Sequence, residues 1–195
     1  DQELPIVDAG PDQILNCEVN EVDLIGDNSS TGGAFIYNWI FNGAGGIDTQ
    51  VNTTVDQPGS YTLEITNINN QCVDSDIVEV VIDTITPLAE AGVTTTLTCD
   101  ITTIMLNGEG SSEGNEFTYT WTSTSGNVID NATTLTPSIE NDGFYVLQVL
   151  NNINGCTNED VVEILIDTLS PQVAIADPDI LTCAVESIEI NSTAS

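Results

Sequence analysis

Two short stretches decide the fold: FIYNWIF at residues 35–41 and FTYTWTS at residues 117–123. In both, aromatic residues stand at every second position up to a tryptophan, with isoleucine, asparagine or threonine between them. Because successive side chains of a β-strand point to opposite faces, this period of two predicts a strand with one buried, aromatic face. We therefore expect these aromatic residues in the core of a β protein: Trp39, Trp121, Tyr37 and Tyr119.

Other landmarks repeat at nearly the same spacing as the two tryptophans, which are 82 residues apart. Prolines, cysteines and a second set of cysteines recur 82 or 84 residues further along the chain: Pro5, Pro87 and Pro171; Cys17, Cys99 and Cys183; Cys72 and Cys156. A fixed period of this kind is the sequence signature of tandem modules. We expect two complete modules, 1–84 and 85–168, and the start of a third at 169–195.

Each module contains further strand patterns. A turn with PG or DG leads into the strands GSYTLEITN (59–67) and GFYVLQVLN (143–151), and the last strands read DIVEVVID and DVVEILID. No window of helical periodicity competes with them. Roughly seven short strands in about 80 residues predict an all-β, immunoglobulin-like sandwich in each repeat of 82–84 residues. Tyr61 and Tyr145 stand where such a fold places its tyrosine corner.

The charge of the chain is entirely negative. It contains 31 Asp and Glu residues but no Lys, Arg or His, for a formal net charge of −31. Binding to nucleic acid or to an anionic membrane surface is excluded as a function class, because both need basic side chains. No apolar run has the length of a membrane span, so we expect no direct membrane insertion.

The same composition argues against catalysis. Without His, Lys or Arg there is no conventional triad, Cys–His pair, Schiff-base lysine or phosphate clamp. A pair of carboxylates could hydrolyse glycosides, but that chemistry needs a deep cleft that an 80-residue sandwich rarely offers. We expect a protein that is not an enzyme.

The motifs YxW, PGSYTLEITNxxxxC and NxxNGCTxxDxVEI resemble the polycystic-kidney-disease-type (PKD) and related immunoglobulin-like repeats of long bacterial surface adhesins and extracellular filaments. The resemblance implies a structural or adhesive role at the bacterial cell surface. The expected partners of the chain are its own neighbouring repeats and lateral copies of itself in a filament.

The resemblance also suggests O-glycosylation at Thr84 and Thr168, within the triplets DTI and DTL. The alternative is an accessory ligand- or carbohydrate-binding module of a secreted multidomain enzyme.

The five cysteines fit two per module, with Cys183 lacking its partner. In an extracellular protein, disulfides are the default. The simpler pairing, Cys17–Cys72 and Cys99–Cys156, is slightly favoured. Straight strands would place Cys17 and Cys72 up to about 30 Å apart, whereas a disulfide needs Cα atoms within about 7 Å. Either the first strand bends, or Cys17 bonds Cys156 across the junction, and both pairings stay open.

Carboxylates at the junctions are candidate calcium ligands. In a string of sandwiches, the end of one module's last strand should meet loops of the next module, and calcium needs six to eight oxygen ligands. The candidates are Asp83, Glu90, Glu109 and Glu113 at one junction, Asp167 at the following one, and Asp27 in the corresponding loop of the first module. We expect calcium as a cofactor, either bound at such sites or screening the acidic surface, with simple solvation as the alternative for these side chains.

Overall fold

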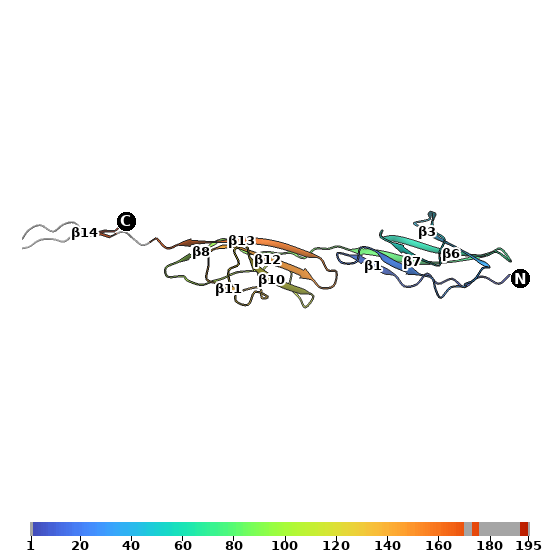
Figure 1. Ribbon diagram of the computed structural model, residues 1–195, viewed down its shortest axis with the longest axis horizontal. Helices are drawn as coiled ribbons and strands as arrows, with labels where there is room; N and C mark the ends of the chain where they lie inside the picture. Colours follow the sequence, from blue (N-terminus) through green and yellow to red (C-terminus); the bar gives the residue numbers. More distant parts are fainter. Residues whose placement is uncertain (1, 170–172, 176–191, 195) are drawn as a thin grey trace, which may run out of the picture.

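The computed structural model describes residues 2–169, 173–175 and 192–194. Two β modules lie end to end along the long axis of the molecule, joined by a short extended segment (Figure 1). The elements of the described residues are all strands. This part of the chain has no helix of the length and apolarity that crossing a membrane requires.

The first module, called module 1, combines a five-stranded sheet in the order β1-β7-β6-β3-β4 with the two-stranded sheet β2-β5. Its strands are β1 (Gln13–Asn16), β2 (Val22–Ile25), β3 (Phe35–Phe41), β4 (Ala44–Asp48), β5 (Asn52–Val55), β6 (Gly59–Asn67) and β7 (Cys72–Asp83). The aromatic stretch is β3, which pairs with β6 so that Trp39 lies opposite Leu63. The architecture is the expected immunoglobulin-like sandwich.

The second module, module 2, repeats this plan with a four-stranded sheet in the order β10-β12-β13-β8 and the two-stranded sheet β9-β11. Its strands are β8 (Thr95–Thr98), β9 (Ile104–Met105), β10 (Phe117–Ser123), β11 (Ser138–Ile139), β12 (Gly143–Asn151) and β13 (Thr157–Asp167). Beyond it, β14 (Val173–Ile175) pairs with β15 (Ser192–Ala194).

Each module has its own hydrophobic core. Trp39 is fully buried in one core and Trp121 is 2% exposed in the other. The half-buried Tyr37 and Tyr119 pack against these cores, and each hydroxyl donates to a backbone carbonyl seven residues earlier in the chain. Two separate cores mean that each module buries its own apolar residues.

The tyrosine corners are present in both modules. The Tyr61 hydroxyl donates to the carbonyl of Gln57 over 2.8 Å, and the Tyr145 hydroxyl donates to that of Asn141 over 2.7 Å. Both tyrosines are buried. The hydroxyls therefore satisfy their own hydrogen-bonding need while tying the turn to the strand that follows it.

The first strand of each module runs parallel to the last strand, and this places the ends of both strands together. In module 1, Asn16 at the end of β1 lies opposite Asp83 at the end of β7. In module 2, Thr98 at the end of β8 lies opposite Asp167 at the end of β13. The cysteine that follows each first strand is therefore held at the end of its module where the last strand also ends.

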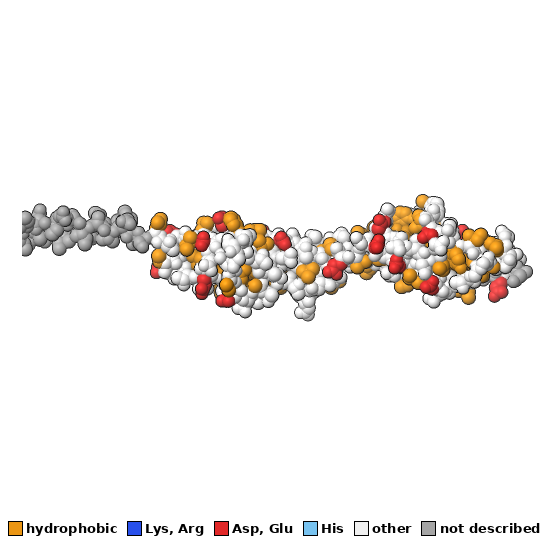
Figure 2. Space-filling view, in the orientation of Figure 1, with side chains coloured by type: hydrophobic (Ala, Val, Ile, Leu, Met, Phe, Trp, Pro, Cys, Tyr) orange, Lys and Arg blue, Asp and Glu red, His pale blue; other side chains and the backbone are white. Residues whose placement is uncertain are grey.

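Figure 2 shows acidic and hydrophobic side chains scattered over one face of both modules. Several aliphatic residues on the outward face of the large sheets are about half exposed: Ile36, Ile77, Val81, Val161 and Leu165.

Candidate functional site

A disulfide joins the two modules. Cys17 of module 1 bonds Cys156 of module 2 with an S–S distance of 2.01 Å and a Cα–Cα distance of 5.0 Å. The slightly favoured within-module pairing, Cys17–Cys72 and Cys99–Cys156, is therefore wrong. Cys72 and Cys99 are free, and Cys183 lies outside the described residues.

The physical reason for this pairing is the direction of β1. Cys17 follows a strand that runs parallel to β7 and ends beside Asp83, the last residue of β7. Cys72 is the first residue of the same 12-residue strand. At roughly 3.3 Å per residue the two ends of β7 are about 36 Å apart. Cys17 thus reaches the hairpin of the next module but not the hairpin of its own.

Asn154, in the hairpin between β12 and β13, is the central polar residue of the junction. Its side-chain amide donates to Oδ1 of Asp83 and to the carbonyl of Ile85, both over 3.0 Å. Its Oδ1 accepts from the backbone N–H of Cys156, and its carbonyl accepts from the N–H of Cys17. Only 2% of Asn154 is exposed. One buried asparagine, through its side-chain amide and its backbone carbonyl, therefore connects the last strand of module 1, the linker and both bonded cysteines.

Close backbone approach completes the junction. A Cβ on Gly155 would collide with the side chain of Glu18, which belongs to module 1, and the φ of Gly155 is +68°. A glycine meets both demands because it has no Cβ and tolerates positive φ. Further along the hairpin, the Asn158 amide donates to the carbonyl of Pro87 over 3.0 Å. The hairpin of module 2 therefore packs tightly against the end of module 1 and the linker.

The candidate calcium ligands do not gather into one cluster among the described residues. Asp83 accepts from Asn154 and from the N–H of Ile85, and Asp167 accepts from the N–H of Leu169. Asp27 lies in module 1, where its Oδ1 accepts from the Asn52 amide. Among the described residues, no group of three or more Asp, Glu, Cys or His side chains could hold a metal ion.

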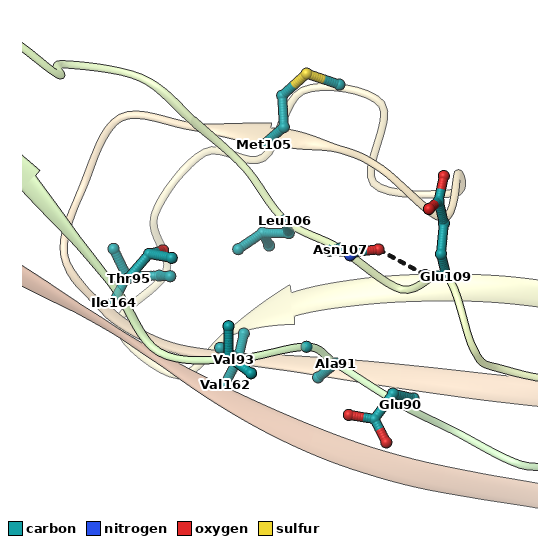
Figure 3. A pocket seen from close by; sticks show the side chains of 11 residues that line it. Glu90, Ala91, Val93, Thr95, Met105, Leu106, Asn107, Glu109, Val162 and Ile164 are labelled. Atoms are coloured by element: carbon teal, nitrogen blue, oxygen red, sulfur yellow. Dashed lines mark hydrogen bonds between the residues drawn. The ribbon is translucent and has the colours of Figure 1, made fainter.

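Glu90 and Glu109 line one pocket of module 2 with a volume of about 420 Å³. Figure 3 shows the two carboxylates at one end of this pocket, with Met105, Leu106 and aliphatic residues of the last strand around the remainder. The lining contains no aromatic ring on which a sugar could stack.

The negative charge of Glu113 acts on a nearby tyrosine. Burial raises the pKa of Tyr119, and the negative charges of Glu113 and Glu116 raise it further. Burial likewise raises the pKa of Tyr61, with Asp56 as the second cause. Both effects favour the neutral phenol.

The two threonines of the DTI and DTL triplets, Thr84 and Thr168, are exposed. Each directly follows the final aspartate of a module's last strand. Both side chains are therefore accessible to a modifying enzyme.

The residue that sequence reasoning missed is Asn154. Its signal was present in the motif NGC, because Asn-Gly commonly marks a tight hairpin turn. The equivalent Asn70 in NNQC stands at the same distance before its cysteine. The same spacing from the cysteine in both repeats indicates a structural role for the amide.

No protein-family model and no curated protein sequence matches the chain. Among solved structures, the PKD domain from the KIAA 1837 protein is 22% identical, with a TM-score of 0.37, covering 42% of this chain and 87% of that domain. Drosophila OTK extracellular domains 3–5 are 14% identical, with a TM-score of 0.42, covering 85% of this chain and 63% of that one. Three immunoglobulin domains of titin are 12% identical, with a TM-score of 0.45, covering 97% and 76%. The chain thus spans slightly less than two thirds of the OTK fragment, and the likeness is one of fold.

Proposed function

We propose that this chain is a structural and adhesive segment of a long extracellular repeat protein, in which each module is a spacer and each junction is held rigid. The observation that carries the proposal is the Cys17–Cys156 disulfide. A bond inside one sandwich would stabilise that module alone. A bond between modules restricts their relative motion, which matters to a stalk or filament that must keep its length.

The location that fits this role is outside the cell, at a bacterial surface. Disulfides persist in oxidising compartments and are rare in the cytosol. The junction disulfide therefore supports secretion, and the sequence motifs resemble repeats of bacterial adhesins and filaments. Exposed aliphatic residues such as Ile77 and Val161 would supply lateral contacts between copies in a filament.

Cations from the medium complete the proposal. With a net charge of −31 and no basic side chain, self-repulsion opposes the compact state. Calcium would act mainly by screening this charge, since the structure offers no ready cluster of ligands among the described residues. We expect the melting temperature to rise with calcium. A similar rise with magnesium at equal ionic strength indicates screening, a larger rise with calcium indicates bound sites, and no change with either ion contradicts a role for divalent cations.

The spacer proposal is tested by small-angle X-ray scattering of the chain before and after reduction. The oxidised chain should give the narrow distance distribution of a rod. Reduction should broaden the distribution as the modules begin to move relative to each other. A flexible oxidised chain would contradict the proposal.

The alternative role as a carbohydrate-binding module has less support, because both tryptophans are buried in the cores.

A further inference from the structure

Two cysteines stand at the outer ends of the two-module unit without a disulfide partner. Cys72 is partly buried and Cys99 is exposed. In the repeat, Cys72 occupies the place of Cys156, and Cys99 occupies the place of Cys17. Those two equivalent positions are bonded to each other at the junction. Each unpaired cysteine is therefore one half of a junction whose complete form the same structure shows.

We propose that Cys99 bonds the hairpin cysteine of a following module, and that Cys72 bonds the cysteine after the first strand of a preceding module. Every junction of the array is then closed by the same disulfide. This inference rests on the proposed function, because it requires further modules of the same kind on both sides.

The hairpin that carries Cys72 already has the conformation of the bonded hairpin. The N–H of Cys72 donates to Oδ1 of Asn70 over 3.0 Å, as the N–H of Cys156 does to Oδ1 of Asn154. The Asn70 amide donates to the carbonyl of Glu3 over 3.0 Å, and the Asn154 amide donates to the carbonyl in the corresponding place of the linker. The polar framework of a junction is thus in place at the start of module 1.

The tip of this hairpin shows the same backbone geometry. Gln71 has a φ of +61° and its N–H donates to the carbonyl of Asn67 over 2.8 Å. Gly155 has a φ of +68° and makes the equivalent bond to Asn151 over 2.8 Å. A positive φ is costly for a residue other than glycine. The Gln71 amide folds back onto the carbonyl of Ile68, so the side chain stays on its own hairpin.

The turn that carries Cys99 is likewise preformed. In module 1, the N–H of Asn16 donates to the carbonyl of Val19 over 2.8 Å and closes the turn around the bonded cysteine. In module 2, the N–H of Thr98 donates to the carbonyl of Ile101 over 2.9 Å, and the Thr98 hydroxyl accepts from the N–H of Ile101. Cys99 is therefore presented on the same turn, and it is exposed.

The aspartate beside this turn also repeats. Oδ1 of Asp83 accepts from the N–H of Ile85 over 3.2 Å, and Oδ1 of Asp167 accepts from the N–H of Leu169 over 3.1 Å. Asp83 receives the amide of the next module's hairpin asparagine. We expect Asp167 to receive the corresponding amide of a following module, which would align that module's cysteine with Cys99.

Closing such a junction is a two-electron oxidation. The two thiols lose two protons and two electrons and form one S–S bond. A disulfide oxidant such as oxidised glutathione accepts them and becomes two thiols. Exchange proceeds through a mixed disulfide, which requires an accessible thiol. The exposed Cys99 is suited to be the first thiol to react.

Overlapping loops follow from this arrangement. The Cys17–Cys156 bond spans 139 residues, which is longer than one repeat of 82–84 residues. The next loop would begin at Cys99, before the first loop ends at Cys156. Every backbone bond inside the array would then lie within at least one disulfide loop. A single proteolytic cut could not separate the array into two pieces, which suits a protein exposed to proteases.

A duplicated chain tests the inference. Residues 1–166 are joined to a complete second copy, so that Asp1 of the second copy takes the place of Asp167. The outermost cysteines are replaced by serine: Cys72 of the first copy, and Cys99 and Cys183 of the second. Because the chain contains no Lys or Arg, Gln2→Lys in the second copy creates one trypsin site, at the new junction. The chain is oxidised with glutathione and cut with trypsin.

The expected result is that the cut chain keeps its full mass on a denaturing gel without reductant and separates completely once reduced. Peptide mapping should find Cys99 of the first copy bonded to Cys72 of the second. The matched control, Cys99→Ser in the first copy, should separate without reductant. Separation of the parent chain without reductant, or alkylation of both thiols, would overturn the inference. Small-angle scattering of the same chain tests the spacer role independently. If the chain is a rigid rod but lacks this bond, the inference is refuted while the spacer proposal stands.

Discussion

The side-chain amide of Asn154 in module 2 donates a 3.0 Å hydrogen bond to Oδ1 of Asp83, the last residue of β7 in module 1. The carboxylate at the junction therefore has a neutral donor from the next module as its partner. This arrangement needs no cation, which matters in a chain without Lys, Arg or His. It also makes the asparagine, and not an acidic cluster, the residue on which the junction geometry depends.

Substitution of Asn154 tests that dependence. Asn154→Ala removes the amide bonds to Asp83 and Ile85 and leaves the buried N–H of Cys156 without its acceptor. We expect a loss of about 2–4 kcal/mol in the free energy of unfolding, measured by chemical denaturation, because unsatisfied buried groups are costly. The matched control is Asn70→Ala, at the equivalent but unoccupied end of module 1, which should cost less than half as much. Equal losses would show that the contact between modules contributes nothing.

The junction disulfide can be tested with a single new lysine. Thr84 is exposed in the linker, and Thr84→Lys gives the chain one trypsin site between the modules. After cleavage, the fragments 1–84 and 85–195 should stay covalently joined until a reductant is added, because Cys17 and Cys156 lie on opposite sides of the cut. Mass spectrometry without reductant measures this directly.

The control for that experiment adds Cys156→Ser to Thr84→Lys. The fragments of this double variant should separate on denaturing electrophoresis without reductant. If the single variant separated in the same way, the disulfide would have to lie within one module.

The tyrosine corner should contribute to stability in each module. Tyr145→Phe removes the hydroxyl that donates to Asn141 from a fully buried position. We expect a loss of about 1 kcal/mol, the usual net value of a buried hydrogen bond. Tyr119→Phe, which removes a hydroxyl from a half-buried ring, should cost less. The reverse order in urea denaturation would argue against a stabilising corner.

Alkaline pH should destabilise the protein through its tyrosines. Burial is the main cause that raises the pKa of Tyr61 and Tyr119 above the ordinary value of 10.0. A raised pKa in the folded state means that the stabilisation is complete below pH 10 and is lost as pH rises through the folded-state pKa. Unfolding free energy should therefore fall above about pH 10, measured with Cys72 and Cys99 alkylated to prevent disulfide exchange.

Glu113→Gln provides the control for this titration. It removes the second cause of the Tyr119 shift, so the tyrosinate absorbance of that residue should appear at lower pH than in the parent chain. An unchanged titration curve would mean that the Glu113 charge does not reach the phenol.

The sandwich fold could be predicted from the sequence because its signals are local. The alternation in residues 35–41 needs only the period of a strand, and the turn before Tyr61 needs only its glycine and its neighbours. The sequence offered Cys17–Cys156 as one of two pairings but could not decide between them. The choice depends on β1 running straight and parallel to β7, which residue periodicity does not specify. Only that direction places Cys17 at the far end of its module.

For the candidate metal residues too, the sequence does not specify which side chains meet in the folded chain. The repeat gives Asp27 and Glu109 equivalent positions, one in each module, so their similarity in sequence reflects repetition and not proximity. Asp83 lies at the junction, where its Oδ1 accepts from the side-chain amide of Asn154. A carboxylate near a boundary indicates a polar contact there. Whether that contact is a metal ion or a hydrogen-bond donor depends on the neighbouring module.

The two core tryptophans differ in one hydrogen bond, and this difference is measurable. The indole N–H of Trp121 donates to the carbonyl of Thr134 over 3.0 Å, whereas the buried indole N–H of Trp39 has no acceptor among the described residues. Replacement by phenylalanine costs packing in both modules, but only Trp121→Phe also breaks a hydrogen bond and leaves a carbonyl unpaired. Trp39→Phe instead removes an unsatisfied buried donor, which itself costs about 1–3 kcal/mol. We therefore expect Trp121→Phe to lower the free energy of unfolding by at least about 1 kcal/mol more than Trp39→Phe does, measured by chemical denaturation. Equal losses, or a larger loss for Trp39→Phe, would show that the Trp39 N–H finds a hydrogen-bond partner in solution.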